Sequence, residues 1–301
     1  MTSLNNQSII DSLTETLDDT YIDTEFCNSI KLVSKDLFLL SSRLKEKIKI
    51  YDFLGELNCL KYLSTAIKNY PNITELNISD SKILVDYMHL VIDEIKNLKY
   101  LTSLNIELTS ISDSEVKELV TLNSLQKLYI GLNNFGYNGI KDIVTLSNLK
   151  LLDLRYIEVN NNSIRALTKL INLSSLCLRG CHLCYIDVRD LSIMENLRIL
   201  DISSNEIDQE GAEMVSKMQN LTEIDISSCS IGNIGAQVIS FMDKLTSLSI
   251  NNNHISDCGA IEISNMKNLT FLDILNNQIE HEGSIALSKM EKLTSLNLER
   301  E

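Results

Sequence analysis

The sequence is poor in residues that interrupt regular structure and in residues that commonly carry out catalysis. Among 301 residues there are one proline, ten glycines and no tryptophan. A single proline, Pro71, argues against disordered, proline-rich linkers between domains. No glycine-rich phosphate-binding loop is present. None of the four histidines stands beside a candidate nucleophile: they are His89, His182, His254 and His281. The sequence therefore indicates neither a catalytic nor a nucleotide-binding site.

Positive charge is also scarce. The formal net charge is −14 at pH 7, and the pI is about 4.8. Nucleic acids and anionic membranes attract basic surfaces, so neither is expected as a main partner. No apolar stretch approaches the ~20 residues that a membrane-spanning helix requires.

Signals for export and for disulfide formation are missing as well. The first residues, MTSLNNQSIIDS, lack the basic region and apolar run of a secretory signal. The seven cysteines are odd in number and have no framework spacing. These features predict a reducing, cytoplasmic setting, either in the producing cell or in a host cell.

What the sequence does contain is a repeated phrase of 24 residues. Four copies follow one another without an insertion from Leu197 to Lys292. A longer first copy of 28 residues starts at Ile73. The later copies start at Leu101, Leu125, Leu149, Leu173, Leu197, Leu221, Leu245, Leu269 and Leu293. A fixed period of this length is typical of a solenoid, in which each unit stacks on the next.

The first half of each copy predicts a short strand and a buried turn. In one copy, Leu200 and Ile202 alternate with polar residues, as in a strand with one buried face. Asn205 follows where the chain must turn, and its amide can satisfy backbone groups that the turn leaves unpaired. Amides, or cysteine as a small buried side chain, fill this slot at Asn133, Cys181, Asn205, Cys229, Asn253 and Asn277. We therefore expect an internal ladder.

The second half of each copy has the spacing of a helix. A small pair, such as Gly211 and Ala212, precedes an apolar stripe. These small residues are expected to let neighbouring helices approach closely. In an earlier copy, Ser112 and Glu115 have the spacing of a capping box at the start of the helix.

Together the two halves predict the fold class. We expect an α/β, right-handed solenoid over residues 73–301, shaped as a horseshoe with a parallel concave sheet and convex helices. Residues 1–72 do not follow the repeat, and their apolar spacing predicts an all-helical N-terminal unit, including a helix over 37–50. Charges at the far end, Glu299, Arg300 and Glu301, would discourage edge pairing.

The repeat resembles a known family. The phrase N-x-I-x-x-x-G-A-x-x-I-S-x-M-x-x-L-T-x-L-D-I is similar to the GALA class of leucine-rich repeats and covers residues 101–301. Such repeats occur in protozoan proteins and in effectors of intracellular or plant-associated bacteria. In several of them an F-box precedes the repeats. F-box proteins bind a Skp-type adaptor and present substrates to a cullin-based ubiquitin ligase.

Part of the N-terminal unit is similar to an F-box. The stretch IKLVSKDLF matches the second half of that motif, whereas Asn5 stands where proline is usual. The resemblance implies an adaptor-binding surface made of Leu4, Ile9, Ile10, Leu13, Leu17, Leu32 and Val33. The alternative is that these helices only cap the solenoid.

Strand residues between the buried leucines are expected to face the concave side, the extended surface that solenoids offer to partners. Exposed tyrosine and arginine are favoured anchors of protein interfaces. Four aspartates in the central column would form an acidic ridge for a basic partner. The predicted protein-binding residues are Lys127, Tyr129, Leu151, Asp153, Arg155, Tyr156, Arg179, Ile199, Asp201, Asp225, Phe271 and Asp273.

One cluster has the spacing of zinc ligands: Cys177, Cys181, His182 and Cys184. The repeat, however, places Cys177 on the concave face and Cys181 in the buried ladder, where the two cannot share a metal. No metal and no cofactor are therefore expected.

These observations predict a non-catalytic protein-binding module. One interpretation is an F-box-type substrate receptor of a cullin-based ubiquitin ligase that holds its target on the concave face. The other is a plain interaction scaffold, or a bacterial effector that binds a host protein, with residues 1–72 only capping the solenoid. An enzyme would require a pocket with converging ionisable groups at the N-terminal junction.

Overall fold

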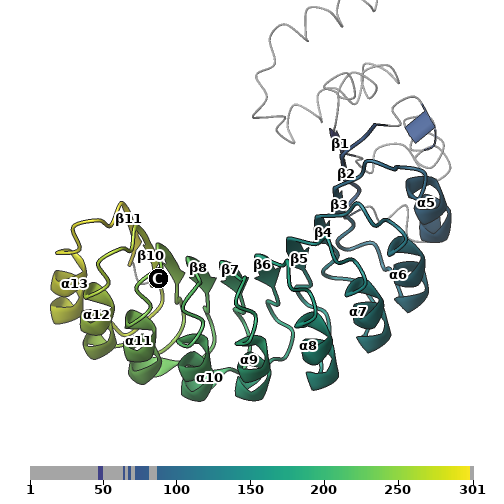
Figure 1. The fold of residues 1–301 in the computed structure, drawn as a ribbon. Helices are drawn as coiled ribbons and strands as arrows, with labels where there is room; N and C mark the ends of the chain where they lie inside the picture. Colours follow the sequence, from purple (N-terminus) through teal and green to yellow (C-terminus); the bar gives the residue numbers. More distant parts are fainter. Residues whose placement is uncertain (1–46, 50–63, 65–66, 69–71, 81–86, 299–301) are drawn as a thin grey trace, which may run out of the picture.

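The computed structural model describes residues 47–49, 64, 67–68, 72–80 and 87–298. These residues form one curved solenoid with strands along its inner side and helices along its outer side (Figure 1). The strands make a single 11-stranded sheet, in which their order follows the sequence. The predicted horseshoe with a concave parallel sheet and convex helices is therefore confirmed.

The strands are three residues long and share one register. They are β1 (Lys47–Lys49), β2 (Glu75–Asn77), β3 (Ser103–Asn105), β4 (Lys127–Tyr129), β5 (Leu151–Asp153), β6 (Ser175–Cys177), β7 (Ile199–Asp201), β8 (Glu223–Asp225), β9 (Ser247–Ser249), β10 (Phe271–Asp273) and β11 (Ser295–Asn297). Equivalent residues of neighbouring copies lie opposite each other, as Leu104 does with Leu128 and Leu152 with Leu176. This pairing confirms the 24-residue period.

The expectation that residues 1–72 are all helical is wrong at β1. Its Ile48 lies opposite Leu76 in a parallel pair, and Leu76 lies opposite Leu104 at the same offset. The solenoid therefore begins earlier than residue 73. Pairing with the open edge of β2 satisfies backbone groups of this stretch, and that long-range contact is not visible in its local helical spacing. Residues 1–46 and 299–301, with the charges expected at the end, lie outside the described residues.

The helices are short and depend on their neighbours. They are α5 (Met88–Ile95), α6 (Asp113–Leu119), α7 (Tyr137–Ile143), α8 (Asn161–Leu167), α9 (Tyr185–Leu191), α10 (Asp208–Val215), α11 (Gly232–Ser240), α12 (Asp257–Ser264) and α13 (His281–Leu287). Isolated helices of this length are unstable in water, so packing on the sheet and on each other holds them. The predicted capping box is confirmed, because the Glu115 carboxylate accepts the Ser112 N–H at 3.0 Å.

The interior contains the aliphatic residues of every copy and the predicted ladder. Leu200 and Leu248 are fully buried, as expected from the strand alternation. Each ladder asparagine bonds to its own copy and to the preceding one: Asn205 donates to the carbonyl oxygens of Ile202 at 2.8 Å and of Leu178 at 2.9 Å. Thr109 fills the same slot in an earlier copy, a substitution that the sequence analysis missed.

A second ladder, also missed, precedes five of the strands, β5 to β8 and β10. The amide of Asn172 donates to the Ser147 carbonyl oxygen at 2.9 Å, and that of Asn196 to the Ile171 carbonyl oxygen at 2.7 Å. The same bond recurs at Asn148, Asn220 and Asn268. Where both ladders are present, a copy is tied to the preceding one both before and after its strand, which holds these copies in register.

Candidate protein-binding face

The concave face presents three positions of each copy. These are the first and third residues of the strand and the residue two places further on, because alternate strand residues point to the same side. In β4 the middle residue, Leu128, is buried, while Lys127 is exposed and Tyr129 half-buried. Strands β4 to β7 are neighbours in the middle of the curved sheet (Figure 1), and six of the predicted contacts lie on these strands or just after them. They are Tyr129, Leu151, Arg155, Tyr156, Arg179 and Ile199, which we call the central cluster.

The side chain of Arg155 is fixed on the concave face by two carboxylates. Its Nε lies 2.9 Å from Asp153 Oδ2 and 3.3 Å from Glu107 Oε1. A Cβ on Gly131 would lie 2.6 Å from Arg155 Cγ, so the glycine makes room for the arginine. The hydrogen bonds with Asp153 are the main cause of the raised pKa of Arg155. The Arg155 side chain covers Asp153, which is only 3% exposed. The prediction of Asp153 as an exposed contact is therefore wrong, and the acidic ridge is interrupted there.

Glu107 has an incompletely satisfied carboxylate next to Arg155. Asn105 Nδ2 donates to one oxygen at 3.3 Å. The other oxygen is buried and, among the described residues, has no hydrogen-bond partner, since Arg155 Nε is close but poorly aligned. Burial, followed by the nearby charge of Asp153, raises the pKa of Glu107. The positive charge of Arg155, 3.3 Å away, is the main compensation for this buried oxygen.

Tyr156 and Arg179 form an exposed pair over a glycine. Arg179 Nε donates to the Tyr156 hydroxyl oxygen at 3.1 Å. A Cβ on Gly180 would lie 2.5 Å from Tyr156 Cε1, so the ring occupies space that only glycine leaves free. Gly180 itself has a φ of +62°, a conformation that favours glycine. Tyr156 is 47% exposed. The structure thus holds both side chains in place while leaving them accessible.

Tyr156 also ends a row of bulky residues in the left-handed conformation. Leu108, Leu132 and Tyr156 have φ values of +53°, +56° and +56° and lie one copy apart, just beyond the concave face. All three are at least 40% exposed. Later copies place residues that tolerate this conformation better at the same position: Gly180, Ser204, Ser228, Asn252 and Asn276. The three copies that start at Leu101, Leu125 and Leu149 therefore keep exposed apolar groups where the backbone disfavours them.

We expect the substitution Leu132→Asn to raise the free energy of unfolding by about 1 kcal/mol, because asparagine adopts a positive φ with less strain. Urea denaturation followed by circular dichroism would measure the change. Leu132→Ala removes the same exposed side chain but keeps most of the backbone strain. Equal stabilities for the two variants would contradict this explanation.

Two further aspartates of the central column, Asp201 and Asp225, have a structural role that the sequence analysis missed. Asp201 Oδ1 accepts the Ser203 N–H at 3.0 Å, and Asp225 Oδ1 accepts the Ser227 N–H at 2.9 Å. Burial raises the pKa of Asp225. The signal was available in the Asp-x-Ser spacing, which favours a turn closed by the aspartate side chain. Both residues remain half-exposed on the face.

Other predicted site residues lie away from the central cluster. Phe271 and Asp273 lie on β10, three strands beyond β7. There Asn251 Nδ2 donates to Asp273 Oδ2 at 2.9 Å. The predicted adaptor-binding residues, Leu4, Ile9, Ile10, Leu13, Leu17, Leu32 and Val33, lie outside the described residues.

The cysteines are placed as the repeat predicted. Cys177 is half-buried on the concave side, with its Sγ 3.3 Å from Asp201 Oδ2, and Cys181 is fully buried in the ladder. Burial raises the pKa of Cys181 to about 12. The part of the chain that the structure describes has no group of three potential metal ligands. None of the helices described there is long and apolar enough to cross a membrane.

Comparisons with known proteins agree with this arrangement. The family described as leucine-rich repeat region matches residues 65–301. Internalin InlF from Listeria monocytogenes has a TM-score of 0.56 at 20% identity, covering 85% of this chain and 67% of its own. Internalin C2 from the same organism has a TM-score of 0.55 at 18% identity, covering 83% of this chain and 99% of its own. A TLR13 chain, in a complex with ssRNA13, has a TM-score of 0.57 at 19% identity, covering 85% of this chain and 36% of its own. No curated protein matches in sequence.

Proposed function

The chain belongs to the leucine-rich repeat family, and on this basis we propose that it is a non-catalytic protein-binding module that holds its partner on the concave face. The observation that carries the proposal is the exposed Tyr156–Arg179 pair seated over Gly180. Tyrosine and arginine anchors of this kind dominate many protein interfaces. Because the pair is already ordered, binding costs it little conformational entropy.

The chemistry of the central cluster indicates the kind of protein that fits it. Tyr129, Leu151 and Ile199 offer apolar surface, with Ile199 40% exposed. On the side toward β8 lie the half-buried residues Asp201 and Asp225. A partner with an apolar patch next to basic groups would complement both regions.

We expect the triple variant Tyr156→Ser, Arg179→Ser, Ile199→Ser to lose at least ~10-fold in affinity, the effect of removing about 1.4 kcal/mol of contacts. Serine occurs at the same three positions in other copies, as Ser204, Ser203 and Ser175, so the variant should fold. Proteins captured from cytosol by the unchanged chain would be identified, and their affinities measured with purified components.

A matched control changes the convex side. Ile261 and Ile285 are exposed on α12 and α13, and Gln237 occupies the equivalent position on α11. Ile261→Gln with Ile285→Gln should leave the affinity unchanged. The concave-face proposal fails if the triple variant binds as tightly as the unchanged chain, or if the control loses as much.

The finer proposal is that the chain is an F-box-type substrate receptor of a cullin-based ubiquitin ligase. It is supported by the resemblance of IKLVSKDLF to the second half of that motif. A purified Skp-type adaptor should then co-elute with the full chain, and Ile9→Asp with Leu13→Asp should abolish co-elution. Absence of co-elution would leave the second candidate, a plain scaffold or a bacterial effector that binds a host protein.

A cytoplasmic location, in the producing cell or a host, is part of the same proposal. Its support is that all five cysteines in the described region are free thiols: Cys177, Cys181, Cys184, Cys229 and Cys258. Disulfides are rare in the reducing cytosol. Cell fractionation with an antibody to the protein would test it.

A further inference from the structure

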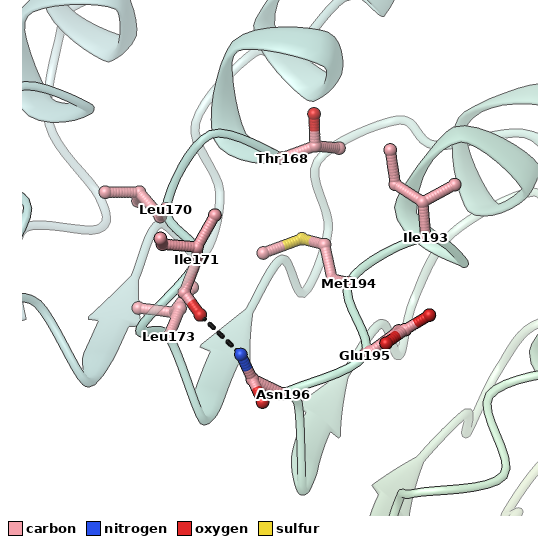
Figure 2. Close-up of a pocket in the computed structure, with 8 residues that line it drawn as sticks. All are labelled: Thr168, Leu170, Ile171, Leu173, Ile193, Met194, Glu195 and Asn196. Carbon is pink, nitrogen blue, oxygen red and sulfur yellow. Dashed lines mark hydrogen bonds between the residues drawn. The ribbon is translucent and has the colours of Figure 1, made fainter.

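A groove lies where α8 and α9 end, away from the concave face. Figure 2 shows Ile171 and Ile193 on its two sides, with Met194 between them and Thr168 toward the helices. The cavity has a volume of about 200 Å³. A more open depression shares Thr168 and Ile193 with it and continues to Arg165, Arg189 and Asp190. We call the two together the α8–α9 groove.

The solenoid does not require the two isoleucines that flank this groove. Ile171 is 71% exposed and Ile193 is 67% exposed. At the position of Ile171 the other complete 24-residue copies carry polar residues: Asn123, Ser147, Glu195, Gln219, Asp243, Lys267 and Glu291. At the position of Ile193 every other complete copy also carries a polar residue, except the copy with Phe241. Two adjacent, exposed apolar side chains at normally polar positions indicate a contact surface.

The same two copies lack the glycine at which the helices of the later copies meet. In α11 a Cβ on Gly235 would lie 3.1 Å from the Ala212 Cβ of α10, so these helices meet at a glycine. In α8 and α9 the glycine position carries Ser163 and Asp187, both buried. The seam of glycines that joins the later helices is therefore interrupted between α8 and α9, at the ends of these helices opposite to the groove.

The charge around the groove differs from that of the rest of the solenoid. Residues 149–198 contain seven basic and five acidic side chains, whereas residues 199–298 contain five basic and fourteen acidic ones. At the groove, Arg165 Nε lies 3.1 Å from Asp190 Oδ2, and an Arg189 terminal nitrogen lies 3.0 Å from Asp190 Oδ1. The Asp190 carboxylate thus forms ion pairs with two guanidinium groups, and both arginine side chains are more than half exposed. Several N–H donors stay available for a second carboxylate.

We propose that the α8–α9 groove binds an extended acidic segment of a partner protein. An aliphatic side chain of that segment lies between Ile171 and Ile193, and an adjacent carboxylate binds Arg165 and Arg189. Charge complementarity favours this occupant, because a basic segment would meet the arginines and an anionic membrane would meet the acidic copies that follow. Glu195, which lines the groove beside the isoleucines, keeps the carboxylate of the segment at the arginine end. The site is independent of the concave face, so one chain can hold two partners at once.

The probe is a fluorescein-labelled synthetic hexapeptide of two leucines flanked by aspartates. Titrated into the full chain, it should shift the δ1-methyl NMR signals of Ile171 and Ile193, with an affinity that falls as salt is added. Ile171→Glu with Ile193→Lys should weaken binding at least ~10-fold, the size expected for an interface anchor. Arg165→Gln with Arg189→Gln should do the same and reduce the salt dependence.

The variants are chosen to fold, because other copies carry the introduced residues at the same positions, as at Glu195, Lys217 and Gln237. The control is Phe241→Lys, which removes an equally exposed apolar side chain outside the groove and should not change binding. Unshifted isoleucine signals, or an equal loss with Phe241→Lys, would overturn the proposal. So would a dimer of the unchanged chain that Ile171→Glu dissociates, since the groove would then bind a second copy.

Discussion

Replacing Asn253 by alanine is expected to lower the free energy of unfolding by about 4 kcal/mol, since four backbone groups lose their partner at ~1 kcal/mol or more each. Asn253 is fully buried. Its Nδ2 donates to the carbonyl oxygens of Ile226 and Asn251 at 2.9 and 3.1 Å. Its Oδ1 accepts the N–H groups of Cys229 and Ile231 at 3.0 and 3.3 Å. The damage therefore reaches the preceding copy as well.

Urea denaturation followed by circular dichroism would measure this loss. The matched control is Cys229→Ala in the neighbouring ladder slot. The Cys229 thiol lies 3.3 Å from the Ile202 carbonyl oxygen and is a weak donor, so we expect a loss of only about 1 kcal/mol. Similar losses for the two variants would show that the amide does not hold the ladder together.

The second large effect is expected at the helix layer. Gly259→Val should lower the free energy of unfolding by about 3 kcal/mol, of which ~2 comes from overpacking and ~1 from a lost helix cap. A Cβ at Gly259 would lie 2.7 Å from Asn233 Oδ1 and 3.2 Å from the Ala236 Cβ of the preceding helix. The same Asn233 Oδ1 accepts the N–H groups of Ser256 and Gly259 at 2.8 and 3.1 Å.

A glycine with open space around it provides the comparison. Nothing lies within 4 Å of a Cβ at Gly136, which is the N-cap of α7. Gly136→Ser should therefore change the stability by no more than ~0.5 kcal/mol. The same denaturation curves would measure both variants. Unchanged stability of Gly259→Val would mean that the helices can separate freely, and that close packing at this glycine is not needed.

These glycines illustrate which parts of the fold were predictable. The close approach of helices at the Gly-Ala pair was predicted and is confirmed where Gly235 meets Ala212. The cap that Asn233 supplies to the next helix was not predicted. It bridges residues 23 and 26 places apart, so only the stacking of one copy on another reveals it. The extra strand β1 was missed for the same reason.

The candidate site shows the same division. Strand alternation correctly placed Tyr129, Arg155 and Ile199 on the concave side. It did not predict that Arg155 would cover Asp153, or that Gly180 would seat Tyr156. Those relations depend on side-chain directions and on the neighbouring copy. The α8–α9 groove escaped the sequence analysis because Ile171 and Ile193 belong to different copies and neither departs from the repeat at a core position.

The sequence by itself determined the period, the register and the set of buried residues. Strand alternation and the turn asparagines repeat every 24 residues, so the spacing of residue types along the chain is enough to reveal both. Only the tertiary structure decided which outward-facing residues remain available to partners. Exposure depends on what the adjacent copy places beside a residue, and in a solenoid that neighbour is a full repeat away along the chain.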